Sequence, residues 1–545
     1  MISALLTAGS TASPIPLELP VPLEITAPKL EYGILAPLMI MMVAACLSVL
    51  VEAFVPRQSR RPVQIGLTLV ALVAALIGTL NSWSGASYQL AAQQTLALDA
   101  PSYATWALLL IFSIGVVVLF AERNGSTETA FVASASSVPG SATEREATAA
   151  HQEQTEVYPL MLFSVFGMMM FAASNELIVM FVALEIFSLP LYLLCGLGRR
   201  RRLISQEAAL KYFLLGALSS AVFLYGVALL YGASGSFELA SIDSAMTAQP
   251  GSSRIALAGM GLVCVGLLFK VGAVPFHTWV PDVYTGAPSP VTAFMSVATK
   301  IAGVVAMVRV LYVGLGALRW DWQPLVAVLA VATMAVGCLV GLVQTDMKRL
   351  LAYSSIAHAG FMLVGIAGAY TVQTGMTQGS SGSFSSVMVY LTGYGLATIG
   401  MFVIIMMVRK SGGESNEIAS WAGLGRRYPW LGAMVTLFML SFAGIPLTFG
   451  FIGKLLVLTA GWRGGWAWLS LLGVLFSAVA AFFYLRVVAV VFFRSPGPAA
   501  EAVEVSPIST GSWLVLVICA LATLGFGLYP QPLIDVFDHA ATFLR

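Results

Sequence analysis

Charged side chains are scarce in this sequence of 545 residues. Only 10% of the residues are Asp, Glu, Lys or Arg, and 59% are hydrophobic, whereas an ordinary soluble domain has roughly 25% charged residues. The formal net charge is +2, so nothing indicates a basic nucleic-acid-binding surface. This composition excludes an ordinary soluble domain. It predicts a protein that lies largely in a lipid bilayer, with no nucleic acid as partner.

Clustered cysteines are also lacking. The five cysteines stand singly within apolar stretches and form no CxxC pair. Iron–sulfur, haem and zinc sites require closely spaced Cys or His ligands, so we expect no metal and no bound cofactor in this chain. The first residues, "MISALLTAGSTASPIPLELPVPLE", contain no basic cluster and predict no cleaved signal peptide.

Long apolar runs are what the sequence has in abundance. A helix of about 20 apolar residues crosses the hydrocarbon core of a bilayer, and its backbone groups are satisfied within the segment. We therefore predict an all-α polytopic membrane protein with about 14 transmembrane helices. The predicted spans are 32–55, 63–81, 105–121, 157–173, 175–197, 207–232, 255–274, 290–313, 324–344, 349–371, 385–408, 430–460, 466–492 and 511–530.

Hydrophilic connections divide these spans into groups. The longest is rich in Ser, Ala, Thr and Glu, a composition that cannot bury a core and predicts a flexible loop or insertion. The predicted organisation is an N-terminal tail (1–31), transmembrane helices 1–3 (32–121), this hydrophilic loop (122–156), helices 4–8 (157–313), helices 9–13 (324–492), and helix 14 with a short tail (511–545).

The basic residues are distributed unevenly between the two sides of the predicted bundle. Of 27 Lys and Arg residues, 16 lie in the odd-numbered connections, and 5 lie in the even-numbered connections and the tails. Cytoplasmic loops carry the excess of Lys and Arg, so both termini are predicted to lie on the non-cytoplasmic side.

Six basic residues lie within predicted spans, where a charge costs roughly 2.5–3.5 kcal/mol. Outside the spans the chain uses 18 Arg and 3 Lys, but inside them it uses 4 Lys and 2 Arg. A desolvated lysine can release its proton, whereas arginine cannot. The preference for lysine inside the spans therefore favours a role in proton transfer. The two arginines are expected to be structural and to extend toward an interface. The six are Lys211, Lys270, Lys300, Lys454, Arg309 and Arg486.

Glu185 lies in the middle of the fifth predicted span, in "VALEIFSLPLYLL". An ionisable group at this depth is a candidate functional residue. The alternative is a structural role, in which the carboxylate pairs with a lysine only to hold two helices together.

Lys211 follows Glu207 by four residues near the start of the sixth span. Such a pair is an ordinary helix stabiliser, so a structural and a functional role both stay open for Lys211.

The stretch "GLLFKVGAVPFHTWVPDVYTGAPSPV" places Lys270 in an apolar run shortly before Pro275. Proline removes a backbone hydrogen bond, and carbonyls freed inside a membrane need protein or water as partners. His277 lies near the same helical face as Lys270. We interpret the two as parts of a hydrated path, although His277 could instead be a hydrogen-bonded core histidine. Asp282 is expected to cap or gate the break.

A second interrupted span, "FAGIPLTFGFIGK", contains Pro446 and Gly450 before Lys454. Paired broken helices are typical of transporters built from inverted repeats. Aligning the two breaks does not superpose Lys270 on Lys454, so the evidence for an internal repeat consists of the two breaks alone.

Lys300 lies near the middle of the eighth span. His358, in "LLAYSSIAHAGFML", either continues the path or is a hydrogen-bonded core residue.

These residues together suggest stations of a proton path along the membrane midplane. The working hypothesis is that Glu185 and Lys270 form an ion pair between helices, which changes the proton affinity of the lysine as it opens and closes. Lys300 would then pass the proton on to Lys454. The candidate path residues are Glu185, Lys211, Lys270, His277, Lys300, His358 and Lys454.

Five stretches resemble one family, the N-type antiporter-like membrane subunits of bacterial NADH:quinone oxidoreductase (respiratory complex I). They are "FKVGAVPFHTWVPDVYTGAPSPVTAFMSVATK", "VALEIFSLPLYLL", "EAALKYFLLGALSSAVFLYG", "KRLLAYSSIAHAGFMLVG" and "FAGIPLTFGFIGK". The resemblance runs from about residue 158 to residue 494. It implies fourteen helices with two inverted, antiporter-like repeats, 157–313 and 324–492, and with helices seven and twelve broken. It also implies a proton path through Glu185, Lys211, Lys270, His277, Lys300 and Lys454.

The resemblance further implies that the chain is part of a translocase and holds no redox centre itself. NAD, FMN, iron–sulfur clusters and quinone belong to the assembled complex, and quinone reduction in partner subunits drives proton translocation through this one. The implied partners are the neighbouring K- and M-type subunits, then the J, A, H and L types, the peripheral NADH-oxidising arm and the lipid bilayer. The implied location is the inner (plasma) membrane of a bacterium.

Related subunits and functions differ in identifiable ways. The L-type subunit carries a long lateral helix after its last span, which this sequence lacks, and the M-type has a glutamate where this chain has Lys454. The alternative function is a subunit of an Mrp-type monovalent cation/proton antiporter. The buried lysines would repel the cation that such an antiporter transports, which disfavours this alternative. A purely structural membrane scaffold would leave those lysines unexplained.

Overall fold

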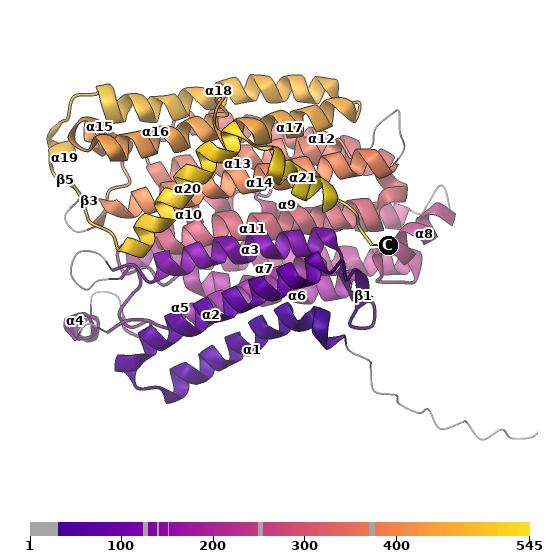
Figure 1. Cartoon of the computed structure of the whole chain (residues 1–545), viewed down its shortest axis with the longest axis horizontal. Helices are drawn as coiled ribbons and strands as arrows, with labels where there is room; N and C mark the ends of the chain where they lie inside the picture. Colours follow the sequence, from indigo (N-terminus) through magenta and orange to yellow (C-terminus); the bar gives the residue numbers. More distant parts are fainter. Residues whose placement is uncertain are drawn as a thin grey trace, which may run out of the picture.

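The computed structural model describes residues 31–123, 129–138, 141–150, 152–248, 254–369, 376–410 and 413–544. The predicted N-terminal tail, 1–31, lies outside these residues except for Glu31. The long helices run roughly side by side in one bundle (Figure 1), with the strands confined to its ends. The described part of the chain thus has the all-α architecture expected from its apolar runs.

The helices and strands follow in chain order. The first half contains α1 (Tyr32–Phe54), α2 (Arg57–Ser84), β1 (Gln89–Ala91), β2 (Leu96–Leu98), α3 (Ala100–Phe120), α4 (Ala142–Ala149), α5 (Val157–Ala173), α6 (Leu177–Cys195), α7 (Arg202–Ser234), α8 (Leu239–Ala248), α9 (Arg254–Val271), α10 (Trp279–Gly286), α11 (Ser289–Arg309) and the π-helical turn η1 (Val310–Gly314).

The second half contains η2 (Gly316–Leu318), α12 (Arg319–Gly341), α13 (Met347–Ala367), α14 (Met376–Met407), β3 (Val408–Lys410), β4 (Gly413–Glu414), η3 (Ile418–Trp421), α15 (Leu424–Arg427), α16 (Pro429–Ala443), α17 (Phe449–Arg463), α18 (Ala467–Phe493), α19 (Pro498–Glu501), β5 (Val503–Val505), α20 (Thr510–Leu528) and α21 (Gln531–His539). Strands β4, β3 and β5 form one small antiparallel sheet, and β1 pairs with β2.

Twelve helices in the described residues are long and apolar enough to cross a membrane. Two shorter apolar helices, α5 and α16, occupy further predicted spans. These findings confirm a multi-pass, all-α membrane protein, whereas the total of fourteen spans stays a prediction. The predicted twelfth span, 430–460, is divided between α16 and α17.

Burial separates central helices from peripheral ones. The apolar window of α11 is 100% buried and that of α13 is 94% buried, whereas the windows of α18 and α20 are only 28% buried. In Figure 1, α1 and α18 lie at opposite edges of the bundle and α20 crosses it obliquely. The exposed faces of the outer helices are apolar, as contact with lipid or with other membrane subunits requires.

Both predicted helix breaks are present, and they share one backbone pattern. Helix α9 ends before Gly272 (φ +78°), and α16 ends before Gly444 (φ +77°). Each glycine donates its N–H to the carbonyl four residues earlier, and the next residue donates to that same carbonyl. This is a glycine-terminated helix end, where a left-handed residue is tolerated because there is no Cβ. Proline follows soon after in both cases and keeps the helix from continuing.

The hydrophilic 122–156 segment differs from the expected flexible loop in its described parts. Phe131 and Val132 are buried, and the Val132 N–H donates to the Leu197 carbonyl at 2.9 Å. Glu153 forms ion pairs with Arg61 and Arg123. The average composition conceals these anchors, because two apolar side chains and one carboxylate hold a segment that is otherwise small and polar.

Candidate functional site

Lys270 lies in the last turn of α9, just before the first break, and is 2% exposed. Its ammonium donates to the Ser188 hydroxyl at 2.7 Å and lies 3.4 Å from the Tyr192 hydroxyl, both on α6. A cation is favoured at a helix C-terminus and near aromatic faces. Four rings lie within 6 Å of the ammonium, those of Phe187, Tyr192, Tyr212 and Phe269.

Glu185 lies one turn before Ser188 on the same helix, α6. The predicted ion pair with Lys270 is not formed in the structure, because the lysine bonds to Ser188 instead. The Glu185 Oε1 atom is buried and has no hydrogen-bond partner within the described residues. The carboxylate lies on the same helix as the hydroxyl that holds Lys270, one turn away from it. The structure therefore shows the two groups near each other but separately held.

Lys300 lies in the centre of α11 and is 3% exposed. Its ammonium donates to the backbone carbonyl of Ser355 on α13 at 2.6 Å, and it lies 5.4 Å from the centre of the Tyr394 ring. A Cβ added at Gly303, one turn further along α11, would lie 3.6 Å from the Cβ of Lys270. The stem of Lys270 therefore packs against α11 about one turn from Lys300.

His358 lies one turn after Ser355 on α13 and is also buried. Its Nδ1 is 2.6 Å from the Tyr390 hydroxyl, and its Nε2 is 3.2 Å from the Tyr484 hydroxyl. The Tyr484 hydroxyl is in turn 2.5 Å from the Ser354 hydroxyl. Both ring nitrogens thus have hydroxyl partners that can donate or accept, so the histidine can exchange its tautomer within a continuous hydrogen-bonded group.

Lys454 lies in α17, after the second break, and is 4% exposed. Its ammonium donates to the Ala443 carbonyl at 2.9 Å and to the Ser477 hydroxyl at 3.0 Å. It also lies 4.9 Å from the centre of the Phe361 ring, three residues after His358 on α13. Helix α13 therefore presents Ser355, His358 and Phe361 in succession between Lys300 and Lys454.

The other two predicted path residues, His277 and Lys211, lie apart from the buried lysines and His358. His277 is half-buried in the segment between α9 and α10, and its Nδ1 is buried without a partner in the described residues. Lys211 has a 45% exposed side chain and forms ion pairs with Glu207 at 2.7 Å and with Asp282 at 2.9 Å. Asp282 therefore belongs to a surface charge cluster, which Arg349 joins at 3.4 Å.

Arg309 corrects one expectation, because it does not extend toward an interface. It is 0% exposed and binds both carboxylate oxygens of Asp99, at 2.7 and 2.9 Å. Asp99 is the N-cap of α3, and it precedes the predicted third span, so sequence reasoning missed it. Arg486 is structural as expected, since it donates to the Leu342 and Gln344 carbonyls beyond α12.

The fold and the site together define a class: an antiporter-like, polytopic membrane subunit with two interrupted helices and, within the described residues, three buried lysines that form no ion pair. The family model described as NADH:quinone oxidoreductase/Mrp antiporter, TM matches residues 174–480. NADH-quinone oxidoreductase subunit N of Cutibacterium acnes (strain DSM 16379 / KPA171202) is 63% identical over 527 residues, which cover 97% of this chain and 98% of that protein. The chain belongs to the NADH-quinone oxidoreductase subunit N family, which confirms the resemblance found in the sequence.

Solved structures are similar in fold. A chain of respiratory complex I from Thermus thermophilus with bound aureothin has a TM-score of 0.72 and 32% identity, and the match covers 92% of this chain and 98% of that one. A chain of the Mrp complex from Dietzia sp. DQ12-45-1b has a TM-score of 0.75 but only 20% identity, with 93% and 97% covered. The second likeness concerns the fold alone.

Proposed function

We propose that this chain translocates protons as a membrane subunit of NADH:quinone oxidoreductase, using energy from quinone reduction in partner subunits. One observation carries the proposal. Lys270, Lys300 and Lys454 are all buried, and within the described residues none has a carboxylate in ion-pair distance. Buried ammonium groups without a counter-ion readily release a proton, and intramembrane ionisable groups mark proton relays.

The proposed path starts at Lys270. Glu185 lies one turn from the hydroxyl that holds the lysine, so movement of the carboxylate toward Lys270 would stabilise its charged form, and movement away would release a proton. Lys300 follows on α11, about one turn from the stem of Lys270. The Ser355–His358 segment of α13 then leads to Lys454. Short gaps between these groups would be bridged by water, which the polar helix breaks can admit.

The remaining path residues are proposed with different roles. Lys211 would act from the surface cluster with Glu207 and Asp282, where it can sense a neighbouring subunit. His277 would act from the first break, where its unpartnered Nδ1 can bind water. The two proposed repeats are 157–313 and 324–492, each containing one interrupted helix.

The assembly follows from the family. Its other membrane subunits are the partners, with the K- and M-type as proposed neighbours, then J, A, H and L, and with the peripheral arm beyond. NAD, FMN, iron–sulfur clusters and quinone would lie in those partners. The proposed location is the bacterial inner membrane, with both termini on the non-cytoplasmic side because of the distribution of Lys and Arg. The cation/proton antiporter alternative has support from fold similarity alone.

Co-purification tests the assignment. The tagged chain is extracted mildly from its native membrane, and the eluate is assayed for NADH–quinone reductase activity and bound flavin. We expect both to follow the tagged chain. If neither does, and vesicles that contain the chain exchange sodium or potassium for protons, the proposal is wrong.

A further inference from the structure

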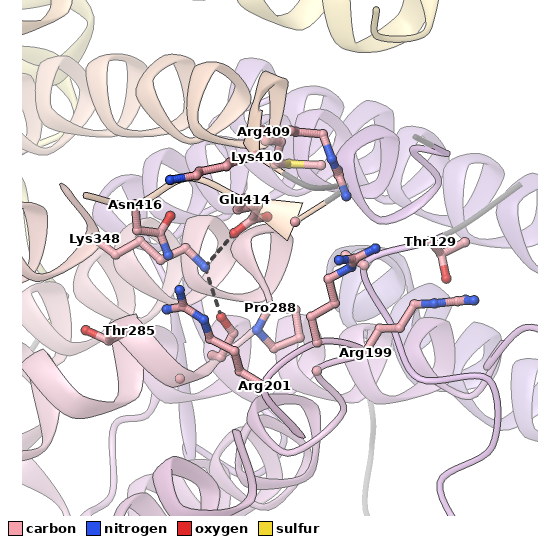
Figure 2. Close-up of a pocket in the computed structure, with 17 residues that line it drawn as sticks. Thr129, Arg199, Arg201, Thr285, Pro288, Lys348, Arg409, Lys410, Glu414 and Asn416 are labelled. Carbon is pink, nitrogen blue, oxygen red and sulfur yellow. Dashed lines mark hydrogen bonds and ion pairs between the residues drawn. The ribbon is translucent and has the colours of Figure 1, made fainter. Parts of the chain in front are cut away.

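The two ends of the central helix α11 differ in their access to water. At its start, the Ser289 hydroxyl donates to Glu414 at 2.6 Å, and Lys348 forms an ion pair with the same carboxylate at 2.9 Å. Figure 2 shows this pair in the lining of a pocket of about 510 Å³, and the Glu414 side chain is 21% exposed. At the other end, Arg309 pairs with Asp99, and these side chains are 0% and 1% exposed. Water can therefore reach the pair at the start of α11 but is excluded from the pair at its end.

The tail after α21 covers the excluded pair. The centre of the Phe543 ring lies 5.2 Å from the Arg309 guanidinium carbon. Leu544 donates its N–H to the Asp99 carboxylate at 3.1 Å. Phe543 also packs edge-on against Phe384 of α14, with 5.2 Å between the ring centres. Figure 1 marks the C-terminus at the same end of the bundle as β1, which precedes α3. The tail is therefore packed into this end of the bundle.

The C-terminal segment is fixed to both ends of α3. Asp99 is the N-cap residue of this helix and Glu122 follows its last turn, and the two residues are 1% and 2% exposed. Glu122 accepts hydrogen bonds from the Ser509 N–H at 2.8 Å and from the Ser509 hydroxyl at 2.5 Å, at the start of α20. Asp99 accepts the Leu544 N–H beyond α21. Residues 509–544 thus form a strap that is held at each end by a buried carboxylate.

The covered end of α11 adjoins a dry stretch of the helix. The residues between Lys300 and Arg309, 301–308, are all apolar and buried. The rise of an α-helix places Arg309 about 14 Å from Lys300 along the axis. A buried ion pair that lost its cover would take up water, because hydration relieves the cost of burying charge. Water at Arg309 would then stand within a few helical turns of a proposed path residue.

We propose that residues 540–544 are a plug that keeps this end of α11 closed to water, so that the helix is hydrated from its other end alone. The inference rests on the proposed function and orientation, in which this end faces the non-cytoplasmic side. The plug would stop protons on that side from entering the bundle beside Arg309 and reaching Lys300. A tail that contributed only to stability would leave the passive proton permeability of the complex unchanged.

Two measurements test the plug. The first is the decay of an imposed pH gradient in proteoliposomes that contain the complex, followed without NADH by an internal pH-sensitive dye. The second is labelling of Ala541→Cys in the purified complex by a water-soluble maleimide, read on this subunit by mass spectrometry. The background is Cys46→Ser, because Cys46 is exposed and the other four cysteines are buried. Ala541 is 4% exposed, so the introduced thiol should react only when the tail leaves its site, and full reaction with an otherwise unchanged tail would contradict the proposal.

Phe543→Ala removes the ring that covers Arg309. Loss of a partly buried phenylalanine side chain should shift the tail about tenfold toward its released form. Labelling and the rate of gradient decay should therefore both rise by about this factor. Phe543→Tyr keeps the ring, and Phe493→Ala removes the same side chain from a position that is 76% exposed, so both controls should behave as wild type. If the Phe543→Ala complex does not assemble, Phe543→Val, which removes less volume, is measured in its place, with changes expected in the same direction.

The outcomes separate a plug from a structural strap. A rise in labelling without faster gradient decay would overturn the proposal, because the released tail would then admit no protons. No change in either quantity in Phe543→Ala, or equal changes in Phe493→Ala, would overturn it as well. NADH-driven pumping is measured on the same vesicles. Loss of pumping in vesicles that hold the imposed gradient would count against the proposed proton path rather than against the plug, so the two failures are distinguishable.

Discussion

The two helix breaks have the same backbone geometry but hold their lysines differently. In the first, Lys270 precedes the break, and its ammonium reaches hydroxyls of another helix, α6. In the second, Lys454 follows the break, and its ammonium returns to the Ala443 carbonyl at the end of α16. The first lysine is thus held by a neighbouring helix alone, whereas the second is held by the end of its own broken helix and by the Ser477 hydroxyl on α18.

This difference assigns different roles to the two halves. Lys270 is held by Ser188, one turn from Glu185, whose Oε1 atom has no partner within the described residues, so movement of this carboxylate toward the lysine would control its charge. Lys454 contacts no hydroxyl that lies one turn from a buried carboxylate within the described residues, and the Ala443 carbonyl at a helix end holds its ammonium. We infer that Lys270 is the end of the path where coupling enters, and that Lys454 is a fixed acceptor.

The largest expected effect follows from removal of Lys270. Lys270→Met should reduce proton pumping per electron at least tenfold in reconstituted complex and should also slow quinone reduction, because the entry of the path loses its titratable group. Pumping is measured by the quench of a pH-sensitive dye in proteoliposomes. Arg494→Met, at an exposed position beyond α18, is the matched control and should pump normally. Normal pumping by a well-assembled Lys270→Met complex would contradict the assigned role.

The second break can be disturbed at its glycine. A Cβ at Gly444 would lie 2.7 Å from Cδ of Lys454, and the residue has φ +77°. Gly444→Ala should therefore lower both thermal stability and pumping. Gly235→Ala isolates the backbone contribution, because Gly235 has φ +74° but no atom within 4 Å of its added Cβ. The control should cost only about 1–2 kcal/mol, and equal effects of the two variants would show that Lys454 is not displaced.

A smaller effect is expected at the centre of the path. Tyr484→Phe removes the partner of the His358 Nε2 atom, and the net value of one hydrogen bond, about 1 kcal/mol, corresponds to roughly a fivefold slower rate. Tyr529→Phe, at a 68% exposed tyrosine, is the control. Stopped-flow measurement of the pumping rate would show equal rates for both variants if His358 were only a core residue.

The smallest effect on stability is expected at Lys211. Its pairs with Glu207 and Asp282 are about half-exposed, and such surface pairs contribute about 0–1 kcal/mol. Lys211→Ala should therefore change the melting temperature of the subunit little. Arg309→Met provides the contrast, because breaking its fully buried pair with Asp99 should cost about 3–5 kcal/mol. A large loss of stability in Lys211→Ala would indicate that this pair is buried by a neighbouring subunit.

Local chemistry made much of this architecture predictable. Apolar run lengths predicted the helices, Pro275 predicted the first break, and Pro446 with Gly450 predicted the second, because these signals act within a few residues of the backbone. The lysines stood out because each is a charge within an apolar run. What the sequence could not supply were partners set by tertiary packing. The Ser188 contact of Lys270 and the tyrosine contacts of His358 join helices far apart in the chain, and no spacing rule relates them.

The same limit explains the incorrect expectations. The sequence paired Lys270 with Glu185 because opposite charges attract, but a hydroxyl one helical turn away occupies the ammonium instead. It placed Arg309 toward an interface because its partner, Asp99, lies 210 residues away in the chain and no sequence spacing relates the two. It also predicted a flexible loop or insertion for 122–156, although Phe131 and Val132 anchor part of this segment. Each error concerns a contact between distant segments rather than the local structure of one.

The measurement that tests the central claim most directly is proton pumping by the Lys270→Arg complex, compared with wild type at equal NADH–quinone reductase activity. Arginine keeps the positive charge but cannot be deprotonated in a protein. If Lys270 passes protons, the Arg variant should pump as poorly as the Met variant. Full pumping by the Arg variant would contradict the account, because a fixed charge at this position would then be sufficient.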